Sequence, residues 1–213
     1  MTTSPSDRDF RIAVLASGGG TNLQAILDKL HGKGEIDVVG VVSDKPDAQA
    51  LERARAAGVE TAVFPLSDHR GRDERDEAIA EWLEDRAVDL VVLAGYMQLL
   101  SPAFVERFRN RIVNVHPALL PSFPGLDAVQ QALEHGAKVT GVTVHFVDEG
   151  VDSGPIILQA PVEVPDSRDW DELEAEIHRN EHRLLPEAIR LIAAGRVRFD
   201  DRNPRLVVID PEP

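Results

Sequence analysis

The stretch FRIAVLASGGGTNLQAILDKL, residues 10–30, joins an apolar run to a glycine-rich turn and then to a helical pattern. Its first seven residues are mostly aliphatic or β-branched, as in a buried strand. After the turn, apolar side chains recur at helical spacing at Leu23, Ile26, Leu27 and Leu30. The stretch therefore predicts a strand followed by a helix, the repeating unit of α/β proteins with parallel sheets.

The same alternation continues to about residue 110. Apolar strand patterns occupy DVVGVVS (37–43), VETAVFP (59–65) and VDLVVLAG (88–95). Helical patterns lie between them, in AQALERARAAG (48–58) and RDERDEAIAEWLEDR (72–86). The run at 88–95 is the most continuous, which is typical of a central strand buried on both faces. We expect a doubly wound, mostly parallel α/β sheet.

The rhythm changes in the second half of the chain. RIVNVH (111–116) predicts a strand and GLDAVQQALEHG (125–136) a helix, while VTGVTVHFV (139–147) and PIILQAPVEV (155–164) alternate like antiparallel neighbours. A long helical pattern at 169–195 contains Pro186, which should kink or break it. RVRF (196–199) and RLVVI (205–209) are expected to form a terminal hairpin. The C-terminal part thus adds antiparallel strands and a long helix.

Composition excludes several classes of protein. The 213 residues are 43% hydrophobic and 28% charged, as in globular domains. The chain has no cysteine, which excludes disulfides, thiolate metal sites and cysteine nucleophiles. A net charge of -14 argues against a nucleic-acid partner. No apolar run approaches the roughly 18 residues of a membrane span, and the polar opening has no signal-peptide pattern. We expect a cytoplasmic protein with no membrane partner.

The glycine turn SGGGTN has two interpretations. Glycines that precede a helix can present backbone amides to a phosphate at the positive end of the helix dipole. The spacing differs from both the P-loop and the GxGxxG fingerprint. The turn is either a phosphate cradle or a tight turn in which Thr21 or Asn22 caps the helix.

Two polar residues end the strand pattern in RIVNVHPALLPSFPG, residues 111–125. Asn114 and His116 are two residues apart and therefore share one face of the strand. Pro117 ends the strand, at the edge where open α/β sheets form their ligand crevice. His116 is either a core imidazole bonded to the backbone or an acid–base residue at the rim of a pocket.

A third candidate lies in VDEGVDSGPI, residues 147–156. Asp152 is either a turn residue or a carboxylate that hydrogen-bonds His116 and fixes its tautomer. If the segments meet, the amide of Asn114 and the imidazolium of His116 can stabilise an oxyanion while His116 moves a proton. With no serine or cysteine nucleophile in the group, it suits group transfer through a tetrahedral intermediate.

The chain resembles the glycinamide ribonucleotide formyltransferases, the folate-dependent enzymes of purine synthesis. The resemblance runs from about residue 11 to 195 and rests on the order and spacing of several segments: VLASGGGTNLQAI, ERARAAG, DLVVLAGYMQLLSPAF, NVHPALLPSFPG, TGVTVHFVDEGVDSGPIILQ and EHRLLPEAI. It implies formyl transfer from 10-formyltetrahydrofolate to glycinamide ribonucleotide, with no metal. It also implies one formyltransferase domain over 10–200, with a nucleotide-binding half (10–110) and a catalytic and folate half (111–200). Residues 1–9 and 201–213 would be tails or a terminal hairpin.

The resemblance assigns roles residue by residue. The implied catalytic residues are Asn114, His116 and Asp152. The implied substrate-binding residues are Gly20, Thr21 and Asn22 for the phosphate and Glu181 for the glycinamide. The implied folate-binding residues are Arg72, Met97, Gln98, Leu99, Leu100 and Asn114. Without the resemblance, Arg72 and Glu181 would be surface charges, and Met97–Leu100 would be the entry to a helix that begins near Ser101 and Pro102.

Two departures and three alternatives accompany this interpretation. Gln98 replaces an arginine common at that place, and Asp127 stands where some members carry histidine or asparagine. A formyltetrahydrofolate deformylase would use water as acceptor, but that family carries an extra N-terminal domain. A methionyl-tRNA formyltransferase would need a basic RNA-binding domain. A non-catalytic nucleotide-binding domain would use the glycine turn alone. The expected assembly is a monomer or a homodimer.

Overall fold

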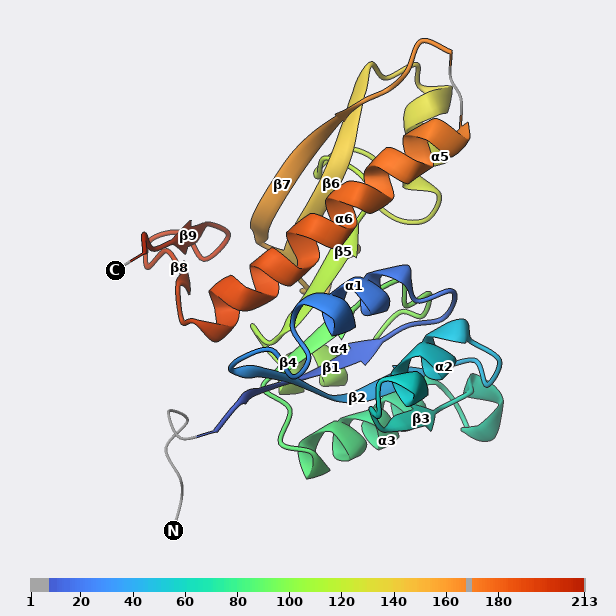
Figure 1. Ribbon diagram of the computed structural model, residues 1–213, viewed down its shortest axis with the longest axis vertical. Helices are drawn as coiled ribbons and strands as arrows, with labels where there is room; N and C mark the ends of the chain where they lie inside the picture. Colours follow the sequence, from blue (N-terminus) through green and yellow to red (C-terminus); the bar gives the residue numbers. More distant parts are fainter. Residues whose placement is uncertain (1–7, 168–169, 213) are drawn as a thin grey trace. The chain divides into compact units, whose positions relative to one another are not determined.

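The computed structural model describes residues 8–167 and 170–212. It divides into two compact units, Met1–Phe104 and Val105–Pro213. Figure 1 shows the chain coloured along the sequence. The predicted tail residues 1–7, and Asp169 at the predicted start of the long helix, lie outside the described residues. Each unit is considered by itself below.

The first unit contains a parallel sheet in the order β3-β2-β1-β4. Its strands are β1 (Phe10–Leu15), β2 (Ile36–Ser43), β3 (Thr61–Val63) and β4 (Leu90–Leu93). All four residues of β4 are buried, as the continuous apolar run predicted. The parallel pairing confirms the interpretation of this half as repeated βα units.

Helices connect these strands, and all of them except the short helix at Leu66–Asp68 lie where the sequence predicted a helix. They are α1 (Thr21–Lys29), α2 (Gln49–Ala56), the short 3-10 helix η2 (Leu66–Asp68), α3 (Arg72–Asp85) and, after β4, α4 (Pro102–Arg107). Gly58, with φ of 75°, follows the end of α2 in the left-handed conformation that glycine adopts readily. The helix boundaries therefore follow the glycine signals in the sequence.

The strand order reverses beside β1, because β2 lies on one side of it and β4 on the other. Loops that leave the carboxyl ends of strands at such a switch point separate and form a ligand crevice. Here the loops after β1 and β4 are joined by two hydrogen bonds. The Ser17 amide donates to the Gly95 carbonyl at 3.0 Å, and the Met97 amide donates to Ser17 Oγ at 2.9 Å. The glycine turn and the Met97–Leu100 segment thus lie at the same switch point.

The second unit contains antiparallel strands in the order β5-β6-β7. Its elements are β5 (Ile112–His116), α5 (Ala128–Glu134), β6 (Val139–Phe146), β7 (Ile156–Glu163), α6 (Trp170–Ala193), β8 (Val197–Phe199) and β9 (Val207–Ile209). The antiparallel pairing of β6 and β7 confirms the expectation from their alternating patterns. β8 and β9 pair as a separate antiparallel hairpin.

The long helix α6 packs along β6 and β7 (Figure 1). Its buried stripe has the helical period and includes Leu173, Ile177, Leu184, Leu185, Ala188 and Ile189. The predicted break at Pro186 is wrong, because the helix continues through it to Ala193. Pro186 is itself buried within this stripe, so side-chain packing on both sides of it holds the helix together. No helix in the described part of the chain is both long and apolar enough to cross a membrane.

Candidate active site

Three polar side chains from two separate segments of the second unit meet, with the carboxylate of Asp152 in contact with the other two. Asn114 and His116 lie on β5, and Asp152 lies in the loop between β6 and β7. Asn114 Nδ2 donates to Asp152 Oδ1 at 3.2 Å, and His116 Nδ1 lies 3.3 Å from Asp152 Oδ2. The convergence that the sequence could only suggest is therefore present.

The backbone holds Asp152 in an uncommon conformation. Its φ is 49°, in the left-handed region that aspartate tolerates better than most residues. The Gly125 amide donates to Asp152 Oδ2 at 2.8 Å. Two residues further on, a Cβ on Gly154 would lie 1.8 Å from the Phe146 carbonyl oxygen, so only glycine fits there. The loop is thereby closed against β6 with the carboxylate directed at β5.

The ring of His116 is buried and faces an oxygen atom at each nitrogen. Its Nε2 lies 2.8 Å from the Phe123 carbonyl oxygen, which can only accept a hydrogen bond. Its Nδ1 faces the carboxylate of Asp152. Both neighbouring oxygens can accept a hydrogen bond, so each ring nitrogen faces a position where it can donate one. The proline-rich loop that supplies the Phe123 carbonyl therefore helps to orient a potential proton carrier.

His145 joins this group, and the sequence analysis missed it. It pairs with Asn114 across β5 and β6, and its Nε2 lies 3.3 Å from Asn114 Nδ2 and 3.6 Å from Asp152 Oδ1. Its Nδ1 donates to the Phe146 carbonyl at 2.8 Å, and its Nε2 faces both the Asn114 amide and the Asp152 carboxylate. The antiparallel register of β5 and β6 would have revealed it, but only the pairing of β6 with β7 was predicted.

Opposing effects set the charge of Asp152. Burial raises the pKa of this carboxyl, whereas the imidazole of His145, the Gly125 amide and the charge of His116 lower it. The stabilising effects outweigh burial, so the pKa lies below its usual value. Asp152 is therefore a carboxylate at neutral pH and can hold a neighbouring imidazolium.

The glycine turn of the first unit is shaped by close packing. Gly20 precedes α1 with φ of 71°, and a Cβ there would lie 2.8 Å from Ala50 Cα. Neither Thr21 nor Asn22 caps the helix, because Gly20 occupies the cap position without a side-chain hydrogen bond. Arg53 Nε donates to the Gly19 carbonyl at 2.8 Å, which brings a positive charge to the turn. Exposed backbone and a nearby cation suit an anion.

The Met97–Leu100 segment lies between β4 and α4. Met97 and Leu99 are 59% and 65% exposed, which is unusual for large apolar side chains. Gln98 and Leu100 are half-buried. Hydrogen bonds hold the backbone of this segment at the Met97 amide and at the Leu99 carbonyl. The exposed side chains of Met97 and Leu99 are therefore held in place where a ligand could contact them.

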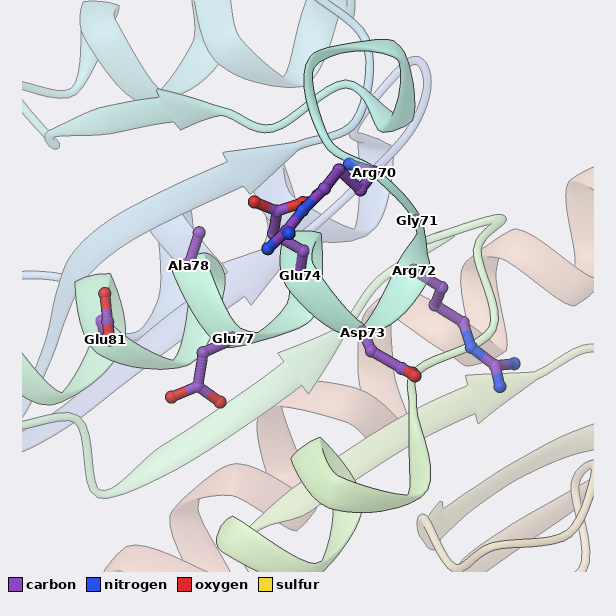
Figure 2. A pocket seen from close by; sticks show the side chains of 8 residues that line it. All are labelled: Arg70, Gly71, Arg72, Asp73, Glu74, Glu77, Ala78 and Glu81. Atoms are coloured by element: carbon purple, nitrogen blue, oxygen red, sulfur yellow. Dashed lines mark hydrogen bonds and ion pairs between the residues drawn. The ribbon is translucent and has the colours of Figure 1, made fainter.

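Arg72 begins α3 and lines an open depression of about 830 Å³ in the first unit (Figure 2). The other charged residues around it are Arg70, Asp73, Glu74, Glu77 and Glu81. Arg70 is committed to Glu74, with Nε 2.9 Å from Oε2. Within residues 8–167 and 170–212, the guanidinium of Arg72 has no such partner, and it points away from the Arg70–Glu74 pair. It is therefore available to an anionic ligand.

Glu181 lies on α6 and is only 5% exposed, so it is not the surface charge that its sequence context would suggest. His178 Nδ1 lies 2.8 Å from its Oε2, and the ring of His178 stacks on that of His182. The hydrogen bond to Glu181 raises the pKa of His178 despite partial burial. Among the described residues, no group of three or more histidine, aspartate or glutamate side chains has metal-binding geometry.

Comparison with known proteins agrees with this geometry. A formyl transferase family model matches residues 10–189. The chain is 45% identical to a phosphoribosylglycinamide formyltransferase of Haemophilus influenzae over 193 residues, covering 90% of this chain and 91% of that protein. It is also 45% identical to a trifunctional purine biosynthetic protein of Drosophila melanogaster, of whose length it spans 14%.

A solved structure is similar over the whole chain. The glycinamide ribonucleotide transformylase 1 of Symbiobacterium toebii is 51% identical, with a TM-score of 0.91 over 95% of both chains. A family match over most of the chain and close identity to full-length relatives together fix the class of the protein. The chain belongs to the formyl transferase family and is an enzyme of the phosphoribosylglycinamide formyltransferase type.

Proposed function

We propose that this enzyme transfers the formyl group of 10-formyltetrahydrofolate to the amine of glycinamide ribonucleotide by direct attack, a reaction of de novo purine biosynthesis. The observation that carries the mechanism is the carboxylate of Asp152, which contacts both the Asn114 amide and the His116 ring. These contacts give one cluster a donor, an acid–base group and a fixed negative charge. Such a cluster serves acyl transfer without a covalent enzyme intermediate.

The roles follow from charge development. As the glycinamide nitrogen forms a bond to the formyl carbon, the formyl oxygen becomes an oxyanion. One N–H of the Asn114 amide and the Nε2–H of the His116 imidazolium stabilise this oxyanion by hydrogen bonds, the latter in place of its bond to the Phe123 carbonyl. His116 gives its proton to the folate N10 as the bond from N10 to the carbon breaks, and it then takes the proton that the amine loses. Asp152 keeps the ring oriented. One preorganised donor of this kind is worth about 3 to 4 kcal/mol.

We propose that the remaining candidates bind the two substrates. Gly20, Thr21 and Asn22 hold the phosphate of the ribonucleotide, supported by the exposed turn and the cation beside it. Met97–Leu100 line the pterin pocket with backbone groups. Arg72 meets the folate, supported by its uncommitted guanidinium.

Glu181 contacts the glycinamide, supported by its burial. Binding energy at the phosphate, a group that takes no part in the bond changes, then orients the amine. We further propose a cytoplasmic enzyme that acts as a monomer or homodimer, without nucleic-acid or membrane partners. The net charge of -14 supports the absence of a nucleic-acid partner.

The test is spectroscopic detection of formyl-folate consumption with and without glycinamide ribonucleotide. Consumption that requires the ribonucleotide is expected, whereas consumption in water alone would identify a hydrolase. His116→Ala should lose about 10²-fold or more in kcat while both ligands still bind. His31→Ala, a half-buried histidine of the first unit that contacts Asp37, is the control and should keep wild-type activity. Unimpaired transfer by His116→Ala would refute the mechanism.

A further inference from the structure

Arg75 is among the largest fully buried side chains of the molecule, although it lies in the highly charged sequence of α3. It is 1% exposed, and its neighbour Asp76 is 0% exposed. Arg75 Nη2 and Nε lie 2.7 and 2.9 Å from Asp76 Oδ1. Burying an ion pair of this kind costs desolvation free energy, so its presence does not by itself show that it stabilises the fold. Its role has to be inferred from the groups that it contacts.

The remaining hydrogen bonds of the pair reach one short segment. Arg75 Nη1 donates to Gln98 Oε1 at 3.0 Å, and Nη2 donates to the Leu99 carbonyl at 3.3 Å. Asp76 Oδ2 accepts from the Ser101 amide at 2.5 Å. The pair thus holds the C-terminal half of the loop between β4 and α4, while Ser17 holds its N-terminal half through the Met97 amide.

A second acidic residue extends the cluster to the end of β2. Gln98 Nε2 donates to Asp44 Oδ2 at 2.9 Å, so Gln98 bridges Asp44 and the guanidinium of Arg75. Burial raises the pKa of Tyr96, and the charges of Arg75, Asp76 and Asp44 all act on this hydroxyl. The guanidinium of Arg75 therefore bonds Asp76 directly and is linked to Asp44 through the side chain of Gln98.

We propose that the Arg75–Asp76 pair is a positioning device for the segment Met97–Leu100, and that the guanidinium it needs can be supplied from position 75 or from position 98. The proposal rests on the proposed function, in which this segment lines the pterin pocket. The side chain of Gln98 contacts both the guanidinium of Arg75 and the carboxylate of Asp44. An arginine at 98 would therefore place a guanidinium beside Asp44 and next to the space that the Arg75 side chain occupies.

Loss of the guanidinium should release the loop without touching the reacting atoms. If the binding-competent loop falls to about a tenth of the population, the apparent Kd for folate rises about tenfold. Arg75→Gln should therefore raise the KM for formyl-folate about tenfold and leave the KM for the ribonucleotide within about twofold. Amide hydrogen exchange of residues 98–101 should become faster. The double variant Arg75→Gln/Gln98→Arg should restore the KM for formyl-folate to within about threefold of wild type.

Arg86→Gln is the matched control, because Arg86 follows the other end of α3 and bonds Glu60 and the Trp82 carbonyl, and none of its described contacts reaches residues 96–101. It should leave both KM values unchanged. A folded Arg75→Gln enzyme with wild-type KM for formyl-folate would overturn the proposal. If Arg75→Gln does not fold, the double variant Arg75→Gln/Gln98→Arg is the test. A folded double variant with a near-wild-type KM for formyl-folate supports the proposal. A double variant that does not fold, or that folds but binds folate weakly, overturns it.

The two proposals fail differently. Calorimetric titration of the wild-type enzyme with oxidised 10-formylfolate, a stable probe, tests the proposed function alone. If the wild-type enzyme does not bind this probe, the proposed function is wrong. If amide hydrogen exchange of residues 98–101 is the same in Arg75→Gln as in wild type, the positioning role is wrong, whatever the activity of the variant.

Discussion

Replacing Asp152 by asparagine removes one charge and keeps the shape of the side chain. In the native site, Asp152 Oδ2 lies 3.3 Å from His116 Nδ1, and the carboxylate is 13% exposed. With an effective dielectric constant of about 20, an imidazolium and a carboxylate at this separation attract by about 5 kcal/mol. The new amide oxygen still accepts one hydrogen bond worth about 1 kcal/mol. The net loss of about 3 to 4 kcal/mol corresponds to about 10²- to 10³-fold in kcat.

The assay is single-turnover formyl transfer, followed by absorbance with both substrates saturating, so that binding does not contribute. Asp148→Asn is the control, because Asp148 lies in the same loop and bonds only the Gly150 amide and Ser153 Oγ among the contacts described. It should change the rate by less than about threefold. A folded Asp152→Asn enzyme within about threefold of wild type would falsify the assignment of an electrostatic role to Asp152.

Two further predictions concern stability. Because Glu181 raises the pKa of His178, the protonated ring stabilises the fold below about pH 6.5, and this contribution is lost as the pH rises through the folded-state pKa. His178→Gln should therefore lower the melting temperature at pH 6 but not at pH 9. The loss in the free energy of unfolding should be less than about 1 kcal/mol, because the ring is 43% exposed. An equal loss of stability at pH 6 and at pH 9 would contradict this. Gly20→Ala should be roughly 1 to 3 kcal/mol more destabilising than Gly32→Ala in denaturant titrations, because both glycines have positive φ but only a Cβ at Gly20 would press against α2. Equal losses in the two variants would show that this packing does not matter.

Much of the architecture was predictable from local pattern. Apolar runs and helical spacing identified the strands and helices of both units, and glycines marked where helices end. The parallel and antiparallel halves were separated correctly, because strands joined through helices and strands joined by short turns leave different rhythms in the sequence. The ordered motifs also identified the family, which the comparisons confirm. The domain limits and the roles of the site residues stay predictions.

Other features depended on contacts between distant residues. Pro186 was expected to kink or break α6, but the helix is not broken there, because the burial of its neighbours outweighs that local preference. His145 enters the active site through the register of β5 with β6, which no local pattern specifies. Arg75 is buried although it lies in a highly charged helix, because it bonds Gln98, which is 23 residues away in the sequence.

The sequence by itself determined which segments are strands and helices, and it placed asparagine and histidine at the end of one strand and aspartate in the loop between two others. Only the tertiary structure decided that Asn114, His116 and Asp152 share one hydrogen-bonded cluster, and that a buried guanidinium holds the loop after β4. The physical reason is range. Backbone preference and hydrophobic period act over a few residues, whereas a hydrogen bond or an ion pair joins whichever groups the packed chain brings within about 3 Å.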